Sequence, residues 1–349
     1  MISSLLSAAA GHSVDHVPVW FMRQAGRSLP EYRRIRGSGS ILDIVHSADL
    51  AAEITLQPVR RYGVDAAILY SDIMVPLAAV GFGIEITQGK GPYVKEPFRS
   101  ESDLARLRKL EPETDMPFVI ETVKLVVKEL RGSETPLIGF AGGPFTVASY
   151  LIEGGSSKDY IKTKTLIRTD PLLFDRLMDR LAVMAVDFLT AQVNAGAAAV
   201  QIFDSWAGVL SAAEYERFVL PPVRFIMDNI ARLGAPRIYF SLSASHLLGH
   251  IATTGCDVMS VDWRMPLSAV KNQLKDTPLS VQGNLDPTYC FAPWEVLRKE
   301  VLQILAEGGG IGHIFNLGHG VLPGTDPKVL HRIVELVQSV APENLVKQV

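Results

Sequence analysis

The chain has 349 residues and a formal net charge of -3 at pH 7, with 48% hydrophobic and 20% charged residues. This composition is typical of a folded protein with a substantial apolar core, and the slightly acidic balance argues against a nucleic-acid-binding protein. The two cysteines, Cys256 and Cys290, have no metal-ligand spacing, so we expect no disulfide framework and a reducing compartment.

The N-terminal segment has no basic leader and only a short apolar run, so we expect no signal peptide and a cytoplasmic protein. The most apolar window, residues 181–203, is interrupted by Asp187, Gln192 and Asn194. This window therefore predicts a buried helix followed by a buried strand, and we expect no membrane partner.

An arginine-rich segment follows the first predicted strand, residues 19–22. It contains Arg23, Arg27, Arg33, Arg34 and Arg36, with only Glu31 as a counter-charge. A guanidinium keeps its charge and binds carboxylates or phosphates in bidentate fashion. Several of them near one strand end predict a site for a ligand with several negative groups. Arg33 and Arg34, taken alone, are better explained as solvated side chains of a helix.

The rest of the chain alternates between helices and short apolar strands. Helices are predicted at 48–62, 117–130, 146–152, 172–194, 212–233, 245–253, 294–306 and 327–340. Strands are predicted at 19–22, 65–70, 136–140, 198–203, 237–240, 258–261, 279–281 and 312–315. The glycines of residues 81–97 punctuate alternating residues and predict a hairpin excursion after the second strand.

Such alternation implies parallel strands that are joined by helical crossovers. Eight units in one chain of this length predict an α/β fold, a single (β/α)8 TIM barrel in which residues 1–349 form one catalytic domain. An open doubly wound sheet is the alternative, but no GxGxxG motif follows the first strand.

In a (β/α)8 barrel the active site lies where the strands end. The predicted strand ends carry Arg23, Asp72, Gly142, Ser205, Ser241, Asp262, Asp286 and His319. A carboxylate such as Asp72 on an apolar floor accepts hydrogen bonds from N–H groups and stabilises a developing cation. The alternative is that Asp72 caps the following helix or pairs with a structural arginine.

Three further polar residues are candidates for ligand contacts. His319 lies in a glycine-flanked loop and is either a donor to the ligand or an exposed loop histidine. Tyr150 follows the third strand on a short helix, where its hydroxyl either reaches the site or belongs to the core. Ser205 has no partners that would make it a nucleophile, so we expect it only to form hydrogen bonds.

Metal and cofactor motifs are absent from the sequence. There is no HExxH, no P-loop and no recognisable Schiff-base lysine motif. The residues therefore predict an acid–base or electrostatic site that is lined with arginine and uses neither metal nor cofactor.

Six motifs together closely resemble those of the uroporphyrinogen decarboxylases. They are MRQAGRSLPEYR at 22–33, YSDIM at 70–74, GFAGGPFTVASYLIEGG at 139–155, QIFDSWAG at 201–208, GNLDP at 283–287 and FNLGHGVLPGTDP at 315–327. The motifs follow the chain in order, one at each of these strand ends. The first motif and GPFTVASYLIEGG are the most specific.

The resemblance implies a homodimeric barrel that needs neither metal nor organic cofactor. The family converts the acetate side chains of uroporphyrinogen III to methyl groups, giving coproporphyrinogen III for haem and porphyrin biosynthesis. By the family pattern, the substrate-contacting residues are Arg23, Arg27, Arg36, Asp72, Tyr150, Ser205 and His319. Among them the resemblance assigns catalytic roles to Asp72, Arg23 and Tyr150.

The chain departs from the family pattern in two places. His46 stands where relatives frequently carry lysine or arginine, and SLSASH at 241–246 replaces a segment that is often rich in glycine. Two alternatives stay open. One is a methyltransferase of the same superfamily, which typically binds zinc through a His-x-Cys arrangement that this chain lacks. The other is a non-catalytic tetrapyrrole-binding barrel.

Overall fold

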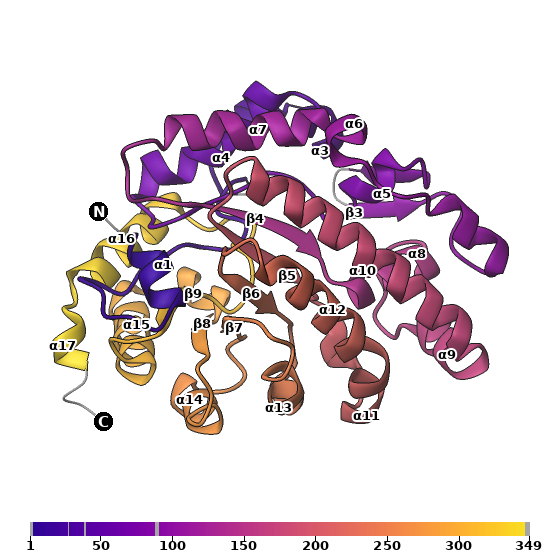
Figure 1. The fold of residues 1–349 in the computed structure, drawn as a ribbon. Coiled ribbons are helices and arrows are strands. Elements are labelled where there is room, and N and C mark those ends of the chain that lie inside the picture. Colours follow the sequence, from indigo (N-terminus) through magenta and orange to yellow (C-terminus); the bar gives the residue numbers. More distant parts are fainter. Residues whose placement is uncertain (1–2, 27, 38–39, 88–90, 346–349) are drawn as a thin grey trace.

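The computed structural model describes residues 3–26, 28–37, 40–87 and 91–345. Its centre is a curled parallel sheet in the order β1-β4-β5-β6-β7-β8-β9. The strands are β1 (Ala67–Ile68), β4 (Leu137–Gly142), β5 (Ala199–Phe203), β6 (Arg237–Phe240), β7 (Val258–Ser260), β8 (Ser280–Leu285) and β9 (His313–Leu317). Helices surround the strands in an arc (Figure 1), so the fold is the predicted α/β barrel.

The first predicted strand closes the ring between β9 and β1. Val19 forms a parallel bridge with Phe315, and the Val19 carbonyl accepts a hydrogen bond of 2.8 Å from the Asp65 amide. The Val19 amide donates to the Asp65 carboxylate, also at 2.8 Å. The segment therefore pairs with β9 through a backbone bridge, while on the β1 side the Asp65 side chain replaces the backbone acceptor.

The helices are α1 (Ser4–Ala9), α2 (Pro30–Arg36), α3 (Ile41–Val45), α4 (Ala48–Tyr62), α5 (Val75–Ala79), α6 (Pro112–Asp115), α7 (Pro117–Glu129), α8 (Pro144–Glu153), α9 (Ile161–Thr169), α10 (Pro171–Asn194), α11 (Ala212–Glu214), α12 (Leu220–Ala231), α13 (Leu248–Ile251), α14 (Leu267–Gln273), α15 (Trp294–Gly308), α16 (Pro327–Ser339) and α17 (Pro342–Leu345). Among the described helices, none is both long and apolar enough to cross a membrane.

The predicted bounds are confirmed for α4 and β6, and the segment predicted as one helix at 212–233 is helical without interruption over 212–231, although its hydrogen-bond pattern changes within it. It is divided into α11, a π-helical turn at Tyr215–Val219, and α12. Pro221 and Pro222 lack the amide hydrogens that a continuous α-helix needs at this point. Helix α9 is not among the predicted elements, because its sequence IKTKTLIRT has few apolar residues.

A two-stranded antiparallel hairpin, β2 (Ile84–Thr87) and β3 (Gly91–Val94), lies between β1 and β4 in the chain. The hairpin contacts α8, since the Val94 amide donates to the Gly154 carbonyl at 3.0 Å. The hairpin therefore supports the C-terminal end of the helix that carries Tyr150.

Buried polar side chains join the strands inside the ring. The Trp20 indole N–H donates to Gln282 at 2.9 Å, and the Gln282 amide donates to Gln201 at 3.1 Å and to Ser260 at 2.9 Å. All four residues are buried, so each of these bonds replaces water that the interior excludes. The network ties the closing segment to β5, β7 and β8.

Candidate active site

Arg23 adopts a backbone conformation that is unusual for a residue with a side chain, with φ of 61°. Its neighbours hold it there. The Met22 amide donates to the Asn316 side chain at 3.1 Å, and the Gln24 side chain donates to the Ala66 carbonyl at 2.9 Å. Strained conformations persist only where the surroundings fix them, and they cluster at functional sites.

The Arg23 side chain lies against the loop that follows β9. A Cβ atom at Gly320 would come within 2.5 Å of Arg23 Cδ and 2.8 Å of Cγ. Only a glycine therefore lets the arginine side chain pass at this point. His319 precedes this glycine, so two of the predicted site residues lie near each other.

Asp72 interacts electrostatically with predicted site residues from other parts of the chain, Arg23 and Tyr150. Its half-buried side chain follows β1 and accepts a hydrogen bond of 2.9 Å from the Met74 amide. Burial raises the pKa of the Asp72 carboxyl above its usual value, while the Met74 N–H and the Arg23 charge lower it. This contact is a local turn before α5 and not the helix cap of the capping alternative, because the N-cap residue of α5 is Met74 and no side chain caps it.

Tyr150, on α8, lies within range of both charges. Burial, followed by the charge of Asp72, raises the pKa of the Tyr150 phenol to about 12, and the charge of Arg23 opposes this shift. Asp72, Arg23 and Tyr150 thus come from three different parts of the chain and share one electrostatic environment. Tyr150 stays protonated at neutral pH and is available as a hydrogen-bond donor.

A second cluster lies beside Asp72 and contains Arg36, Tyr32 and Tyr70. The Arg36 guanidinium lies over the Tyr32 ring, 5.9 Å from its centroid. The hydroxyls of Tyr32 and Tyr70 are 3.0 Å apart. Burial is the main cause that raises the pKa of the Tyr70 phenol, and the hydrogen bond with Tyr32 raises it further. The charge of Arg36 lowers this pKa, and the charge of Asp72 raises it. Arg36 therefore belongs to the same mouth as Asp72.

The loop after β5 brings an aromatic side chain onto Tyr150. The Trp206 ring lies 4.1 Å from the Tyr150 ring, at an interplanar angle of 30°, and Tyr160 meets Trp206 edge-on at 5.2 Å. Ser205 is half-buried in this loop, directly before Trp206. The contact places Ser205 near Tyr150.

Aromatic contacts cross the mouth of the barrel. Phe140 packs on Phe203 at 5.5 Å, Phe203 packs on Phe240 at 6.0 Å, and the His319 ring stacks on Phe240 at 6.0 Å and 21°. Since β6 and β9 are not neighbours in the sheet, the stacking of His319 on Phe240 spans the carboxyl-terminal end of the barrel. The site thus combines an aromatic surface with charged groups.

Asp204, which directly follows β5, is fully buried and is not among the predicted site residues. Its carboxylate accepts hydrogen bonds from the Thr146 amide at 2.9 Å, the Thr146 hydroxyl at 2.7 Å and the Tyr239 hydroxyl at 3.1 Å. Burial raises the pKa of Asp204 to about 6, although the three hydrogen bonds from these donors lower it. The only signal in the sequence was its place next to Ser205.

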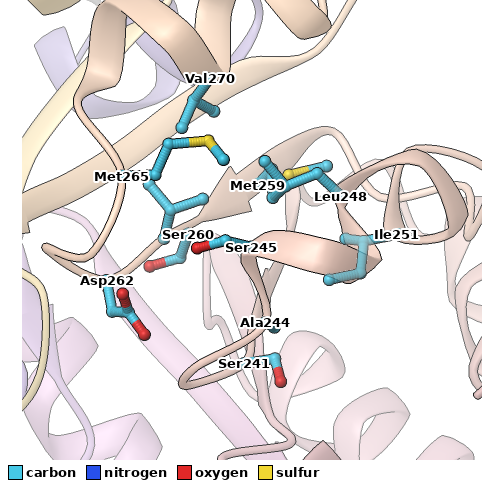
Figure 2. Close-up of a pocket in the computed structure, with 11 residues that line it drawn as sticks. Ser241, Ala244, Ser245, Leu248, Ile251, Met259, Ser260, Asp262, Met265 and Val270 are labelled. Carbon is cyan, nitrogen blue, oxygen red and sulfur yellow. The ribbon is translucent and has the colours of Figure 1, made fainter. Parts of the chain in front are cut away.

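A small pocket of about 10 Å³, room for roughly one water molecule, lies beside β6 and β7. Ser241, Ser245 and Asp262 line it together with apolar side chains (Figure 2). Asp262 is already held by the amide and guanidinium of Arg264, at 2.9 and 2.8 Å. Since no predicted substrate-contacting residue lines this pocket, we do not assign it to the site.

The two departures from the family pattern lie on structural contacts. His46 Nδ1 lies 2.6 Å from the Leu42 carbonyl oxygen, and the His46 ring packs on Phe118 at 4.3 Å. His246 Nε2 lies 2.8 Å from the Leu210 carbonyl oxygen. Arg27 lies outside the described residues.

Within the described part of the chain, no group of three or more His, Cys, Asp or Glu side chains is arranged to hold a metal ion. Fold and site together define a parallel α/β barrel. Its carboxyl-terminal mouth combines arginine side chains, aromatic rings and the carboxylate of Asp72, whose pKa is raised by burial. Such a site suits a flat, polyanionic ligand that also offers N–H donors.

The profile of the family described as Uroporphyrinogen decarboxylase (URO-D) matches residues 2–340. The uroporphyrinogen decarboxylase of Salinispora tropica is 53% identical over 323 residues, which cover 92% of this chain and 86% of that protein. The protein of the same name from Saccharopolyspora erythraea is 51% identical over 346 residues, covering 96% and 94%. The chain belongs to the uroporphyrinogen decarboxylase family.

Solved structures of lower identity share the fold. A methyltransferase from Methanosarcina mazei superimposes with a TM-score of 0.76 at 22% identity, covering 95% of this chain and 96% of that one. A B12-independent methionine synthase from Shewanella superimposes with a TM-score of 0.57 at 12% identity, covering 97% and 98%. These likenesses describe the fold alone.

Proposed function

We propose that this chain is a uroporphyrinogen decarboxylase, which converts the four acetate side chains of uroporphyrinogen III to methyl groups and releases coproporphyrinogen III. The observation that carries the proposal is the convergence of Asp72 with Arg23 and Tyr150 at the barrel mouth. Membership of the family, at about half identity to its curated members, supports the same activity.

The substrate class fits the chemistry of the mouth. A porphyrinogen carries acetate and propionate carboxylates, which suit Arg23 and Arg36, and the family pattern adds Arg27. Its pyrrole N–H groups converge on the centre of the macrocycle, where one carboxylate such as Asp72 can accept them. Its flat rings suit the half-buried rings of Phe203 and His319, which both pack on the buried Phe240.

The proposed reaction begins when a general acid protonates the pyrrole ring carbon beside an acetate arm. Asp72, bound to the pyrrole N–H groups, stabilises the cation that results. The bond to the carboxylate carbon then breaks, carbon dioxide leaves, and the electron pair enters the ring and neutralises the cation. Protonation of the exocyclic carbon and loss of the added ring proton restore the aromatic pyrrole and leave a methyl group.

In this scheme the protonated pyrrole accepts the electron pair of the broken carbon–carbon bond, which an organic cofactor accepts in other decarboxylases. Arg23 is assigned to a carboxylate arm next to the reacting one. A guanidinium is a poor acid at neutral pH. A cation bound to the reacting carboxylate would also stabilise its negative charge in the ground state. Because that charge is lost when carbon dioxide forms, such a contact would slow the reaction. Tyr150, Ser205 and His319 are assigned to hydrogen bonds with the remaining arms.

The proposal further comprises one catalytic domain over residues 1–349, a homodimer and a cytoplasmic location. These three parts rest on the family pattern and on the composition of the chain. Sedimentation velocity at micromolar concentration tests the dimer directly, and a monomer at that concentration would contradict it.

Anaerobic incubation with freshly reduced uroporphyrinogen III tests the activity, with and without a metal chelator. The products are oxidised and separated by the number of their carboxylates. We expect porphyrins with seven down to four carboxylates to appear stepwise and equally fast with chelator. Substrate that remains unchanged while bound to the protein would instead indicate a binding protein.

A further inference from the structure

The loop after β5 and the first turn of α8 are joined by two buried side chains, Thr146 and Asp204. Both are at most 1% exposed. The Thr146 hydroxyl donates to the Asp204 carboxylate at 2.7 Å and accepts from the Trp206 amide at 3.0 Å. The Thr146 amide also donates to this carboxylate, at 2.9 Å. Three hydrogen bonds thus connect a helix and a loop that belong to different barrel units.

Each partner lies next to a predicted substrate contact. Tyr150 follows Thr146 by four residues on α8, so the two side chains lie on one face of the helix. Ser205 follows Asp204 directly, and Trp206 packs on Tyr150 at 4.1 Å. Any shift of α8 against the β5 loop would therefore change the separation of Tyr150 and Ser205.

The surroundings leave the pair little freedom. A Cβ atom at Gly143, where α8 begins, would come within 2.3 Å of Asp204 Cβ, so the helix start is pressed against this residue. The second carboxylate oxygen accepts from Tyr239 at 3.1 Å, and Tyr215 in turn donates to Tyr239 at 3.2 Å. Asp204 is thus anchored to β6 and to the π-helical turn on its far side.

We propose that Thr146 and Asp204 form a positioning pair, which fixes Tyr150 and Ser205 relative to each other so that they hold the carboxylate arms of the substrate. The pair does not touch the substrate itself. This inference rests on the proposed decarboxylase function. It predicts that loss of the Thr146 hydroxyl acts through Tyr150.

A double-mutant cycle on uroporphyrinogen III turnover tests this coupling. Thr146→Val keeps the shape of the side chain and removes its hydroxyl. We expect it to lower kcat/KM by about tenfold in the otherwise unchanged enzyme, and by less than about threefold in the Tyr150→Phe background. Thr146→Ser keeps both hydroxyl bonds and should restore kcat/KM to within about threefold of the unchanged enzyme.

Tyr239→Phe is the matched control. It removes one hydrogen bond from Asp204 but none that reaches α8 or Trp206, so we expect lower thermal stability with kcat/KM within about threefold. If Thr146→Val fails to fold, Thr146→Ala enters the same cycle, because it removes the same bonds with a smaller side chain.

Equal losses from Thr146→Val with and without the Tyr150 hydroxyl would overturn the inference, as would an equal loss in Tyr239→Phe. Either result would mean that the pair contributes only to stability. An unchanged enzyme that leaves uroporphyrinogen III intact would instead refute the proposed function, and the inference with it.

Discussion

The hydroxyls of Tyr32 and Tyr70 lie 3.0 Å apart, and their rings are tilted by 60° at a centroid distance of 5.7 Å. This single bond joins α2, which carries Arg36, to the end of β1, which precedes Asp72. The distance between one predicted carboxylate-binding cation and the predicted catalytic carboxylate therefore depends on two buried tyrosines.

Tyr70→Phe should weaken substrate binding more than the chemical step. It leaves the Tyr32 hydroxyl without its partner, and we expect a loss of about 1 kcal/mol in unfolding free energy together with a several-fold rise in KM. Urea unfolding and steady-state kinetics measure the two effects. The double variant with Tyr32→Phe should recover part of the stability. An unchanged KM would show that Arg36 does not depend on this bond.

Asp72→Asn should leave the fold intact and lower kcat by about 100- to 1,000-fold, because the amide keeps the shape but not the charge that stabilises the cation. Asp286→Asn is a matched control, since Asp286 follows β8 and makes the same type of contact, 2.9 Å to the Thr288 amide. We expect nearly full activity from the control. Normal turnover by Asp72→Asn would refute the electrostatic role.

Gly320→Ala should act on Arg23 from the opposite loop. The added methyl group would overlap the middle of the arginine side chain, so the guanidinium has to move, and we expect kcat/KM to fall by about tenfold or more. Gly249→Ala adds the same methyl group to α13, where nothing lies within 4 Å, and should have no effect on kcat/KM. Equal activities of the two variants would contradict the packing argument.

His313 should make the unfolding free energy depend on pH. Burial lowers the pKa of its imidazole to about 4 from 6.5, so between these values the unfolded chain binds a proton that the folded chain does not. The stability is fully present above pH 6.5 and falls as the pH drops toward 4, by roughly 3 kcal/mol. Chemical unfolding at several pH values measures this slope, and His313→Gln should flatten it. Parallel slopes would exclude His313 as the cause.

The sequence by itself determined most of the secondary structure. Helix α4 begins and ends where its apolar spacing and Gly63 predicted, because a glycine in the left-handed conformation ends a helix through local backbone geometry. The strands were visible because buried parallel strands are short apolar runs between helices. The motifs at the strand ends likewise named Arg23, Asp72 and Tyr150 as candidates.

Only the tertiary structure decided how these candidates meet. The closing of the ring depends on the pairing of Val19 with Phe315 from the other end of the chain, and no local pattern encodes that partner. Asp204 resembles any carboxylate at a strand end until its burial and its bonds to Thr146 are seen. Periodicity reports which face of an element is buried, whereas the burial of a charge and the distance between two side chains arise from contacts between residues far apart in the sequence.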